Sequence, residues 1–376
     1  MILGKLCLET MRLEDITKLI QPILVRGSVN CDIEGIAYDS RQVRANHLFV
    51  AIRGEHVNGE DYIEDAIRRG AVAVVSEQDA WHRRNVAHIH VENARLALAE
   101  ISSAYFGHPS QRLELFGITG TNGKTTTSFM LKAILEQAGR QPGLIGTVRY
   151  EIGPRIIPAT RTTPESTDIQ FMFDQMIRSG CESAVMEVSS HALDQKRVYG
   201  VAFDVGIFTN LSRDHLDYHG TMENYFDAKC QLFRSLGQLG KSSTAVINLD
   251  DEWGMRITQT NGLSAKLVTY GEHPSAMVRA EHVEITPAGT TFDLESPWGR
   301  ACIEVPLPGR HNVSNALAAI AAAACRGIEL PVIAQALRDM AQVPGRLQLF
   351  KGRSGVHAYV DYAHTDDALN RVLTTL

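Results

Sequence analysis

The segment that most constrains the fold is the run Thr119–Thr126, which reads Thr-Gly-Thr-Asn-Gly-Lys-Thr-Thr. The apolar stretch Leu115–Thr119 leads into it as a strand, and Lys124–Ala138 follows with the length of a helix. A glycine turn between a strand and a helix lets backbone N–H groups approach phosphate oxygens at the helix N-terminus. In such a turn Lys124 would reach the terminal phosphates and Thr125 would bind Mg²⁺. The segment therefore predicts a nucleotide-phosphate loop.

This loop departs from the standard phosphate-loop pattern at one position. The standard pattern places a glycine at position 118, where this chain has Ile118, and Gly117 comes one residue too early. The alternative interpretation is an ordinary glycine turn that caps a helix. We favour the phosphate loop, because Gly-Lys-Thr between a strand and a helix is a specific combination.

Short apolar segments recur beyond the loop and alternate with segments of helical length. Strands are expected at Ala184–Val188, Val205–Thr209 and Ala245–Asn248. This alternation predicts an α/β fold with a mostly parallel sheet covered by helices. Ligands of such folds bind in the polar loops at the strand ends.

The length of 376 residues exceeds one ordinary hydrophobic core, so several domains are expected. Residues 1–107 mix short strands and helices, and a junction follows. Residues 108–344 carry the strand–helix alternation. Residues 345–376 begin a further domain with a strand at His357–Asp361, and the chain is expected to stop early in that domain.

Composition excludes several classes of protein. Lys and Arg number 37 against 43 Asp and Glu, and the net charge of −6 argues against a nucleic-acid-coating protein. The six cysteines form no C-x-x-C pair, so neither a zinc ribbon nor a disulfide framework is predicted. The N-terminus lacks the apolar region of a signal peptide, and no apolar run reaches membrane-span length. These features predict a cytoplasmic protein without membrane contact.

Polar residues follow two of the predicted strands. Glu187 ends one strand within Met-Glu-Val-Ser-Ser-His and is a candidate Mg²⁺ ligand. The alternative, that it only caps the next helix, is equally compatible with the spacing. The segment Thr209–Gly220 contains two histidines and two aspartates within six residues, which could form a metal site. Such a cluster is more often a solvated loop, and Lys229, taken alone, resembles a surface lysine on an amphipathic helix.

Together and in this order, these segments resemble the Mur ligases over essentially the whole chain. The variant loop with Ile118 is the form that this family has. The resemblance is strongest to the MurE branch, whose members add a diamino acid to UDP-MurNAc-L-Ala-D-Glu. It implies an N-terminal α/β UDP-binding domain, a central P-loop-type ATPase domain and the start of a Rossmann-like C-terminal domain.

The resemblance also implies roles for individual residues. Catalytic roles fall on Lys124, Glu187, His215 and Lys229. Mg²⁺ ligands would be Thr125, Glu187, His215 and Lys229, the last as a carbamate formed with CO₂. The ATP contacts would be Gly120, Thr121, Asn122, Gly123, Lys124, Thr125, Thr126, Asn312, Arg346 and Asp361. The UDP end of the substrate would contact Tyr38, Ser40, Glu55, His56 and Val57, and the muramoyl dipeptide Arg161, Thr162, Thr163, Ser190, Gln195 and Arg197.

The implied reaction is ATP-dependent amide formation through an acyl phosphate, with two Mg²⁺ ions and a monomeric enzyme. The third amino acid, meso-diaminopimelate or L-lysine, stays open. Two alternatives also stay open. One is another member of the superfamily, such as MurF, MurC or a folylpolyglutamate synthetase. The other is a non-catalytic protein that binds UDP-muramoyl peptide or ATP.

Overall fold

The computed structural model describes residues 10–54, 57–79, 85–260, 262–352, 356–364 and 366–375. The chain divides into two compact units. The first unit contains the residues up to Pro109 together with Pro164–Asp174 and Gln195–Val201. The second contains Ser110–Thr163, Gln175–Asp194 and Ala202–Leu376. The domain boundaries drawn after residues 107 and 344 stay predictions.

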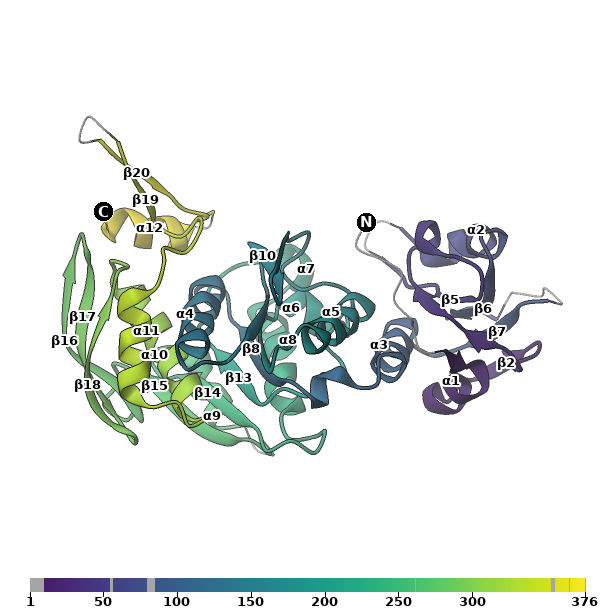
Figure 1. The fold of residues 1–376 in the computed structure, drawn as a ribbon, viewed down its shortest axis with the longest axis horizontal. Helices are drawn as coiled ribbons and strands as arrows, with labels where there is room; N and C mark the ends of the chain where they lie inside the picture. The colour runs from purple at the N-terminus through teal and green to yellow at the C-terminus, as the bar shows by residue number, and fades with distance from the viewer. Residues whose placement is uncertain are drawn as a thin grey trace. The chain divides into compact units, whose positions relative to one another are not determined.

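The first unit is built on a five-stranded sheet in the order β2-β7-β6-β5-β4, parallel except for β2. Its strands are β2 (Leu24–Arg26), β7 (Ala87–His90), β6 (Ala71–Ser76), β5 (His47–Val50) and β4 (Gly35–Ala37). A smaller pair joins β1 (Met11–Arg12) to β3 (Asp32–Ile33). The helices are α1 (Leu13–Ile20), α2 (Ile63–Arg68) and α3 (Ala94–Tyr105) (Figure 1).

Alternation along the strands gives this sheet two apolar faces. Leu48 and Val50 face one cluster, which includes Leu98 of α3, whereas Phe49 faces another, which includes Ala66 of α2. Successive side chains of a strand point to opposite faces of a sheet. The short apolar strands are therefore buried on both sides, as parallel strands usually are.

The second unit contains an eleven-stranded sheet in the order β11-β10-β9-β12-β8-β13-β14-β15-β16-β17-β18. Its strands are β8 (Glu114–Thr119), β9 (Pro142–Ile145), β10 (Arg149–Ile152), β11 (Arg155–Pro158), β12 (Ser183–Glu187), β13 (Val205–Phe208), β14 (Thr244–Asn248), β15 (Lys266–Gly271), β16 (Val278–Thr286), β17 (Gly289–Ser296) and β18 (Gly299–Val305). The strands from β9 to β16 in this order pair in parallel, and both ends are antiparallel hairpins.

The rest of the second unit consists of helices and of a small β-pair that precedes the last helix. The helices are α4 (Lys124–Gln137), α5 (Ser166–Arg178), α6 (Ser190–Asp194), α7 (Leu216–His219), α8 (Met222–Ser235), α9 (Glu252–Thr258), α10 (Arg310–Ala324), α11 (Leu330–Asp339) and α12 (Asp366–Thr375). Strands β19 (Gln348–Lys351) and β20 (His357–Val360) form the pair. The division between the two units passes through α5.

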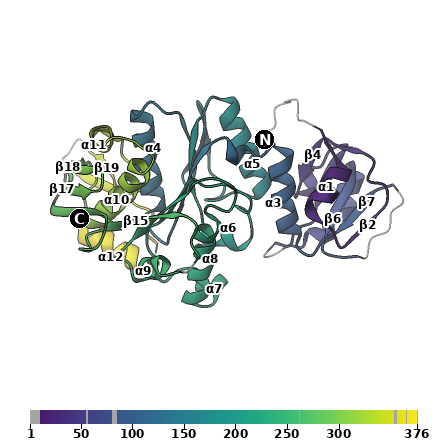
Figure 2. The ribbon, with the colours of Figure 1, turned by 90° about the horizontal axis from the view of Figure 1, so that it is seen from below.

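Helix α10 brings a second polar segment close to the phosphate loop. Figures 1 and 2 show it beside α4, and the two helices are in contact. Its run from Ala316 to Ala324 is almost entirely buried, because alanine and a few larger apolar residues let neighbouring helices approach closely. The polar first turn of α10 is thereby placed near the first turn of α4.

The structure confirms the predicted α/β class with a mostly parallel sheet. The strands predicted at Ala184–Val188, Val205–Thr209 and Ala245–Asn248 correspond to β12, β13 and β14 within one residue at each end. The antiparallel strands β16 to β18 were not predicted. No helix in the described part of the chain is long and apolar enough to cross a membrane.

Candidate functional site

The glycine loop lies between the end of β8 at Thr119 and the start of α4 at Lys124. Gly120 has φ +145° and Gly123 has φ +87°, a region that side chains rarely adopt. A Cβ atom on Gly120 would overlap with Thr209 Oγ1, and one on Gly123 would overlap with Asn315 Oδ1. Both backbone conformation and close packing therefore require glycine at these two positions.

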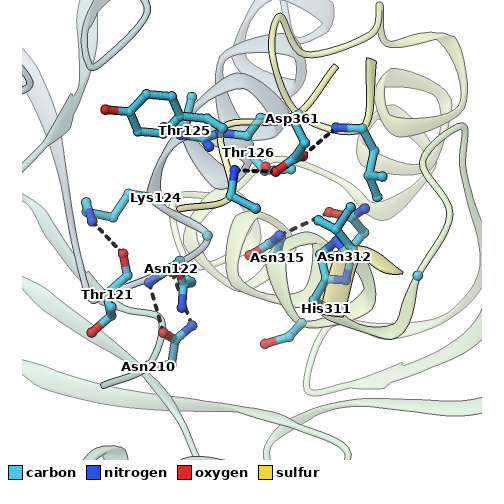
Figure 3. Close-up of a pocket in the computed structure, with 18 of the residues that line it drawn as sticks. Thr121, Asn122, Lys124, Thr125, Thr126, Asn210, His311, Asn312, Asn315 and Asp361 are labelled. Carbon is cyan, nitrogen blue, oxygen red and sulfur yellow. Dashed lines mark hydrogen bonds between the residues drawn. The ribbon is translucent and has the colours of Figure 1, made fainter. Parts of the chain in front are cut away.

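Residues that follow β13 hold the loop in shape. Thr209 Oγ1 donates to Asn122 O at 2.6 Å, and Thr121 N donates to Asn210 O at 2.8 Å. The Asn210 side chain accepts from Asn122 N at 3.0 Å and donates to Asn122 O at 3.1 Å (Figure 3). These hydrogen bonds were not predicted from the sequence. The signal for them was the polar pair Thr209 and Asn210, which directly follows the strand β13.

Lys124 folds back over its own loop. Its Nζ donates to Gly120 O at 2.9 Å and to Thr121 O at 2.8 Å (Figure 3). Burial lowers the pKa of Lys124, Glu187 opposes that shift, and Arg346 reinforces it. These two hydrogen bonds hold the amino group at the loop where phosphates are expected to bind. A bound phosphate could replace the two carbonyl oxygens as acceptor.

Glu187 ends β12 and is fully buried beside the first turn of α4. Its Oε2 accepts from Thr125 Oγ1 at 3.0 Å and from Thr147 Oγ1 at 2.9 Å, and its Oε1 accepts from Thr147 N at 2.9 Å. The interpretation that Glu187 only caps the next helix is therefore wrong, because its carboxylate is engaged by α4 and the loop before β10. Thr147 was missed by sequence reasoning.

The oxygen atoms of Thr125 and Glu187 fit a hard divalent cation. Within the described residues, no group of three or more His, Cys, Asp or Glu side chains could hold a metal by itself. Mg²⁺ does not need such a cage, because it keeps several waters and is commonly bound by one or two protein oxygens and by substrate phosphates. The hydroxyl and carboxylate beside the loop therefore suit Mg²⁺ better than a transition metal.

Lys229 lies inside the protein on α8, so the interpretation as a surface lysine is wrong. Its side chain is among the largest that are fully buried. Its Nζ donates to Gly120 O at 2.9 Å and lies 4.4 Å from the ring centroid of Tyr225. Burial and the nearby Lys124 lower the pKa of Lys229 well below its usual value.

His215 precedes α7 in a left-handed conformation with φ +52°. Burial lowers its pKa, although Asp214 opposes the shift. A neutral imidazole can bind a metal ion, whereas a protonated one cannot. The centroid of the His215 ring lies 4.8 Å from that of His191 and 6.1 Å from that of Tyr225. The Tyr225 ring also contacts Lys229. The structure thus places His215 and Lys229 around one aromatic side chain.

The loop opens into a cavity of ≈ 780 Å³ in the second unit. Its walls are formed by residues at the ends of β8, β12 and β13, by the first turns of α10, and by the segment around β20. Lining residues include Thr121, Asn122, Gly123, Lys124, Thr125, Thr126, Glu187, His215, Asn312, Arg346 and Asp361. All but one of the residues predicted to contact ATP therefore line one cavity, and the exception, Gly120, lies in the loop itself.

The distal members of this set are fixed by hydrogen bonds. The Asn312 amide donates to Pro308 O at 2.8 Å and accepts from Asn315 at 3.1 Å (Figure 3). Arg346 Nη2 donates to Thr125 Oγ1 at 3.1 Å. The Asp361 carboxylate accepts from the backbone N–H groups of residues 347 and 363, each at 2.7 Å. Asn315 was not predicted, although it follows Asn312 at one helical turn.

The predicted dipeptide contacts of the second unit lie beside Glu187. Thr162 Oγ1 is 3.0 Å from Thr147 Oγ1, and Thr163 Oγ1 donates to Glu187 O at 2.8 Å. The backbone of Arg161 bonds with the Tyr150 hydroxyl. Ser190 is buried, with its Oγ 2.9 Å from His219 Nε2.

The remaining predicted contacts belong to the first unit. Tyr38 Oη donates to Asp168 Oδ2 at 2.6 Å, and the Ser40 hydroxyl donates to Asp65 at 2.9 Å. Arg197 Nη2 donates to Gln195 Oε1 at 2.6 Å. Val57 is exposed. Glu55 and His56 lie outside the described residues.

Family models match two parts of the chain. Residues 118–323 match the Mur ligase middle domain, and residues 32–106 match the model described as Mur ligase family, catalytic domain. The first match contains the glycine loop, Glu187, Lys229 and Asn312.

Two named relatives match nearly the whole chain. The chain is 44% identical to the UDP-N-acetylmuramoyl-L-alanyl-D-glutamate–2,6-diaminopimelate ligase of Geobacter metallireducens, over 97% of this chain and 72% of that protein. The ligase of the same name from Clostridium tetani is 42% identical, with 97% and 75% covered. The chain thus spans about three quarters of the length of these relatives.

Solved structures extend the comparison to the fold. A UDP-N-acetylmuramoyl-L-alanyl-D-glutamate–2,6-diaminopimelate ligase superposes with a TM-score of 0.83 at 32% identity, covering 98% of this chain and 74% of that one. MurF from Acinetobacter baumannii shares the fold with a TM-score of 0.73 at 23% identity, covering 99% and 77%. With its variant phosphate loop, its buried carboxylate and these relatives, the chain belongs to the Mur ligase family.

Proposed function

We propose that this chain is the ligase that joins 2,6-diaminopimelate to UDP-MurNAc-L-Ala-D-Glu at the expense of ATP, in peptidoglycan biosynthesis. The observation that carries the proposal is that Lys124 and Thr125 of the phosphate loop line one cavity together with Glu187, which accepts a hydrogen bond from Thr125. The relatives that bear this name cover nearly the whole chain at more than 40% identity. Their shared name favours diaminopimelate over lysine as the third amino acid.

The proposed chemistry is carboxylate activation. The γ-carboxylate of the substrate D-Glu attacks the γ-phosphorus of ATP, so that an acyl phosphate forms and ADP leaves. The amine of the diamino acid then attacks the acyl carbon, an amide bond forms, and inorganic phosphate leaves with the loss of one amine proton. The protein supplies no covalent nucleophile, because the substrate carboxylate serves as one. Its task is to position the reactants and to stabilise charge.

Lys124 is the residue proposed to act on the transferring phosphoryl group. Its ammonium group rests on the carbonyl oxygens of Gly120 and Thr121. A phosphate in the loop offers the ammonium a charged acceptor in place of neutral ones, and charge-assisted hydrogen bonds are about twice as strong. Lys124 would therefore turn toward the γ-phosphate when ATP binds.

Thr125, Glu187, His215 and Lys229 would hold the two Mg²⁺ ions of the proposed enzyme. The bound ions would neutralise negative charge on the phosphate oxygens and on the attacking carboxylate. Thr125 and Glu187 present a hydroxyl and a carboxylate to one point beside the loop. Burial lowers the pKa of His215, which favours the neutral imidazole that can bind a metal.

The proposed carbamate on Lys229 is supported by the surroundings of that side chain. Carbamate formation requires a neutral amine as the nucleophile that attacks CO₂. Burial and the charge of Lys124 lower the pKa of Lys229 and so favour that neutral form. Once formed, the carbamate is an anion with two oxygen ligands of the kind that Mg²⁺ prefers.

The first unit is proposed to bind the UDP-muramoyl part of the substrate through Tyr38, Ser40 and the segment that contains Val57. We further propose that the enzyme acts in the cytoplasm, because ATP and UDP-linked precursors are intracellular compounds. A monomer is proposed from the family resemblance alone.

A product assay tests the function. The purified chain is incubated with ATP, Mg²⁺, bicarbonate and UDP-MurNAc-L-Ala-D-Glu, with meso-diaminopimelate or L-lysine in parallel, and products are identified by mass spectrometry. We expect a UDP-MurNAc-tripeptide that contains diaminopimelate. Lys124→Met should abolish it, whereas Lys132→Met, on the same helix but outside the cavity, should not. Absence of product together with absence of UDP-dipeptide binding would refute the proposal.

A further inference from the structure

A buried carboxylate in the first unit lies between two arginines. Glu165 is 4% exposed, and its two oxygen atoms face different guanidinium groups. Oε1 lies 3.1 Å from Arg197 Nε, and Oε2 lies 3.3 Å from Arg95 Nη1. The arginine side chains are themselves largely buried, 13% exposed for Arg197 and 18% for Arg95.

Two neighbouring side chains, Glu165 and Gln195, restrain the orientation of the Arg197 guanidinium. Its buried Nε makes no hydrogen bond within the described residues but lies 3.1 Å from Glu165 Oε1 as an ion pair, and Gln195 Oε1 accepts from its Nη2 at 2.6 Å. A guanidinium is planar, so contacts at two of its nitrogen atoms define the plane and direction of the whole group. Gln195 and Arg197 are both proposed to contact the muramoyl dipeptide.

Arg95 connects the same carboxylate to the segment proposed for the UDP end. Besides Glu165, it donates to the carbonyl oxygen of Arg53, from Nη2 at 2.9 Å and from Nε at 3.3 Å. Arg53 pairs with Asn58, the residue that follows Val57, in an isolated antiparallel β-bridge. One guanidinium thus links the backbone of Arg53 to Glu165, and through Glu165 to Arg197.

The charged residues sit at the ends of helices that contact each other. Arg95 is in the first turn of α3, and Glu165 immediately precedes α5, where its carbonyl accepts from Ile169 N at 3.0 Å. Farther along the two helices, Ser102 Oγ lies 2.8 Å from Thr167 Oγ1, and the rings of Phe106 and Phe171 lie 6.0 Å apart. These contacts join the C-terminal end of α3 to the first half of α5, next to Glu165.

Stability alone is a poor reason for such a cluster. Desolvating buried ions is costly, and a buried ion pair is often no better than well-packed apolar side chains of similar size. A guanidinium such as that of Arg197 is well suited to bind a carboxylate or a phosphate. The proposed substrate is anionic, because it carries a diphosphate and the carboxylates of its dipeptide.

We propose that Glu165, braced by Arg95, positions the Arg197 guanidinium for a carboxylate of the UDP-muramoyl dipeptide. Glu165 does not touch the substrate; it acts through Arg197. The Arg53 contact of Arg95 couples this position to the backbone close to Val57, which is proposed to contact the UDP end. The inference rests on the proposed function, because it takes the UDP-muramoyl dipeptide as the ligand.

The test is a double-mutant cycle on binding of UDP-MurNAc-L-Ala-D-Glu, measured by titration calorimetry on the full chain. The variants are Glu165→Gln, Arg197→Met and the two combined, and ADP binding is measured in each. The matched control is Asp79→Asn, which removes the carboxylate that pairs with Arg26 at 2.9 Å on the surface of the same unit. We expect Glu165→Gln to weaken UDP-dipeptide binding about 10-fold, as loss of one charge-assisted contact does.

The proposal also predicts the results of further measurements. The combined variant should bind the UDP-dipeptide no more weakly than Arg197→Met alone, because Glu165 acts through Arg197. ADP binding and the melting temperature should stay close to those of the control. Arg95→Lys, which keeps the charge but lacks the planar fork that contacts Glu165 and Arg53 O, should reproduce part of the loss. In a turnover assay, KM for the UDP-dipeptide should rise while kcat changes little.

Other results would overturn the proposal. One is that Glu165→Gln binds the UDP-dipeptide as tightly as the control does. Another is that the combined variant binds it more weakly than Arg197→Met alone. Either outcome would show that Glu165 does not act through Arg197. An equal loss of ADP binding and thermal stability would assign the cluster a purely structural role. If the unmodified chain binds ADP but not the UDP-dipeptide, the proposed function itself fails, which the variants alone could not reveal.

Discussion

The ammonium groups of Lys124 and Lys229 donate to the same acceptor, the carbonyl oxygen of Gly120, each at 2.9 Å. Burial lowers the pKa of Lys229, and repulsion by the charge of Lys124 at the same carbonyl lowers it further. A carbamate on Lys229 would replace that repulsion with attraction. The pair therefore links the proposed modification of one lysine to the proposed phosphate-binding role of the other.

Removing the Lys229 side chain should abolish most of the ligase activity. We expect Lys229→Ala to lower kcat by about 100-fold or more, because the proposed metal site loses an anionic ligand. Short carboxylates such as formate or acetate should restore part of the activity by occupying the vacated space. Tripeptide formation is measured with and without them, and Lys266→Ala, at an exposed lysine, is the control. Full activity of Lys229→Ala without additives would refute the metal role of Lys229.

Substituting Gly120 should damage nucleotide binding without unfolding the chain. In Gly120→Ala the new methyl group would overlap with Thr209 Oγ1, the hydroxyl that holds Asn122 O. We expect ATP affinity, measured by titration calorimetry, to fall at least about 10-fold as the loop is displaced. Gly240→Ala is the matched control, because Gly240 also has positive φ, +81°, but nothing lies within 4 Å of the added atom. Equal ATP affinity in the two variants would contradict this account.

The local parts of the site could be predicted from the sequence, whereas its assembly could not. The strand–loop–helix order around Lys124 is encoded in consecutive residues, and the structure has β8 and α4 where they were expected. Lys229 looked like a surface residue because its helix carries charged neighbours. Its burial depends on the approach of α8 to the glycine loop, which no local pattern reveals.

Thr147 illustrates the same limit. It lies in an irregular segment between β9 and β10, with no motif around it. It becomes a partner of Glu187 only because β9 and β12 are neighbours in the sheet. Strand order is set by tertiary packing, and the sequence shows only which segments are strands. The antiparallel hairpins β16 to β18 were missed for a related reason, since a sheet can be extended by strands that no longer alternate with helices.

The Thr147 hydroxyl should affect metal use more than nucleotide affinity. Its Oγ1 donates to Glu187 Oε2 at 2.9 Å and lies 3.0 Å from Thr162 Oγ1. Thr147→Val keeps the shape of the side chain but leaves the carboxylate less firmly oriented. We expect the Mg²⁺ concentration for half-maximal activity to rise by about 10-fold, in the range typical for loss of a group that orients a metal ligand. Thr290→Val, in β17, is the control, and an unchanged Mg²⁺ dependence would contradict the prediction.

Cysteine reactivity should report the burial of α8. Burial raises the pKa of Cys230 to about 12, so its thiolate is scarce at neutral pH. Cys302 in β18 is exposed. Iodoacetamide applied to the native chain at neutral pH should modify Cys302 well before Cys230, as read by peptide mass spectrometry. Rapid modification of Cys230 in the folded protein would mean that α8 opens readily, whereas both thiols should react in denaturant.

His47 should make the first unit less stable in mild acid. Burial lowers its pKa below the usual 6.5, and Arg44 adds to the shift. His47 is half-buried in β5, where its ring packs against Gly35, so a charged imidazole is disfavoured in the folded state. Between the lowered folded pKa and 6.5, the unfolded chain therefore binds more protons than the folded chain. By linkage, the free energy of unfolding falls as the pH decreases through this window and is insensitive to His47 above it.

A His47→Gln variant isolates this contribution. The difference between the two melting temperatures is measured from about pH 5 to about pH 8, a range that includes the unfolded His pKa. We expect the free energy of unfolding of the unmodified chain to fall relative to the variant below pH 6.5, by at most about 1.4 kcal/mol per pH unit, the limit for one proton. His357→Gln, at an exposed histidine of β20, is the control. If the difference between His47→Gln and the unmodified chain is the same at every pH, His47 is not held neutral by the fold.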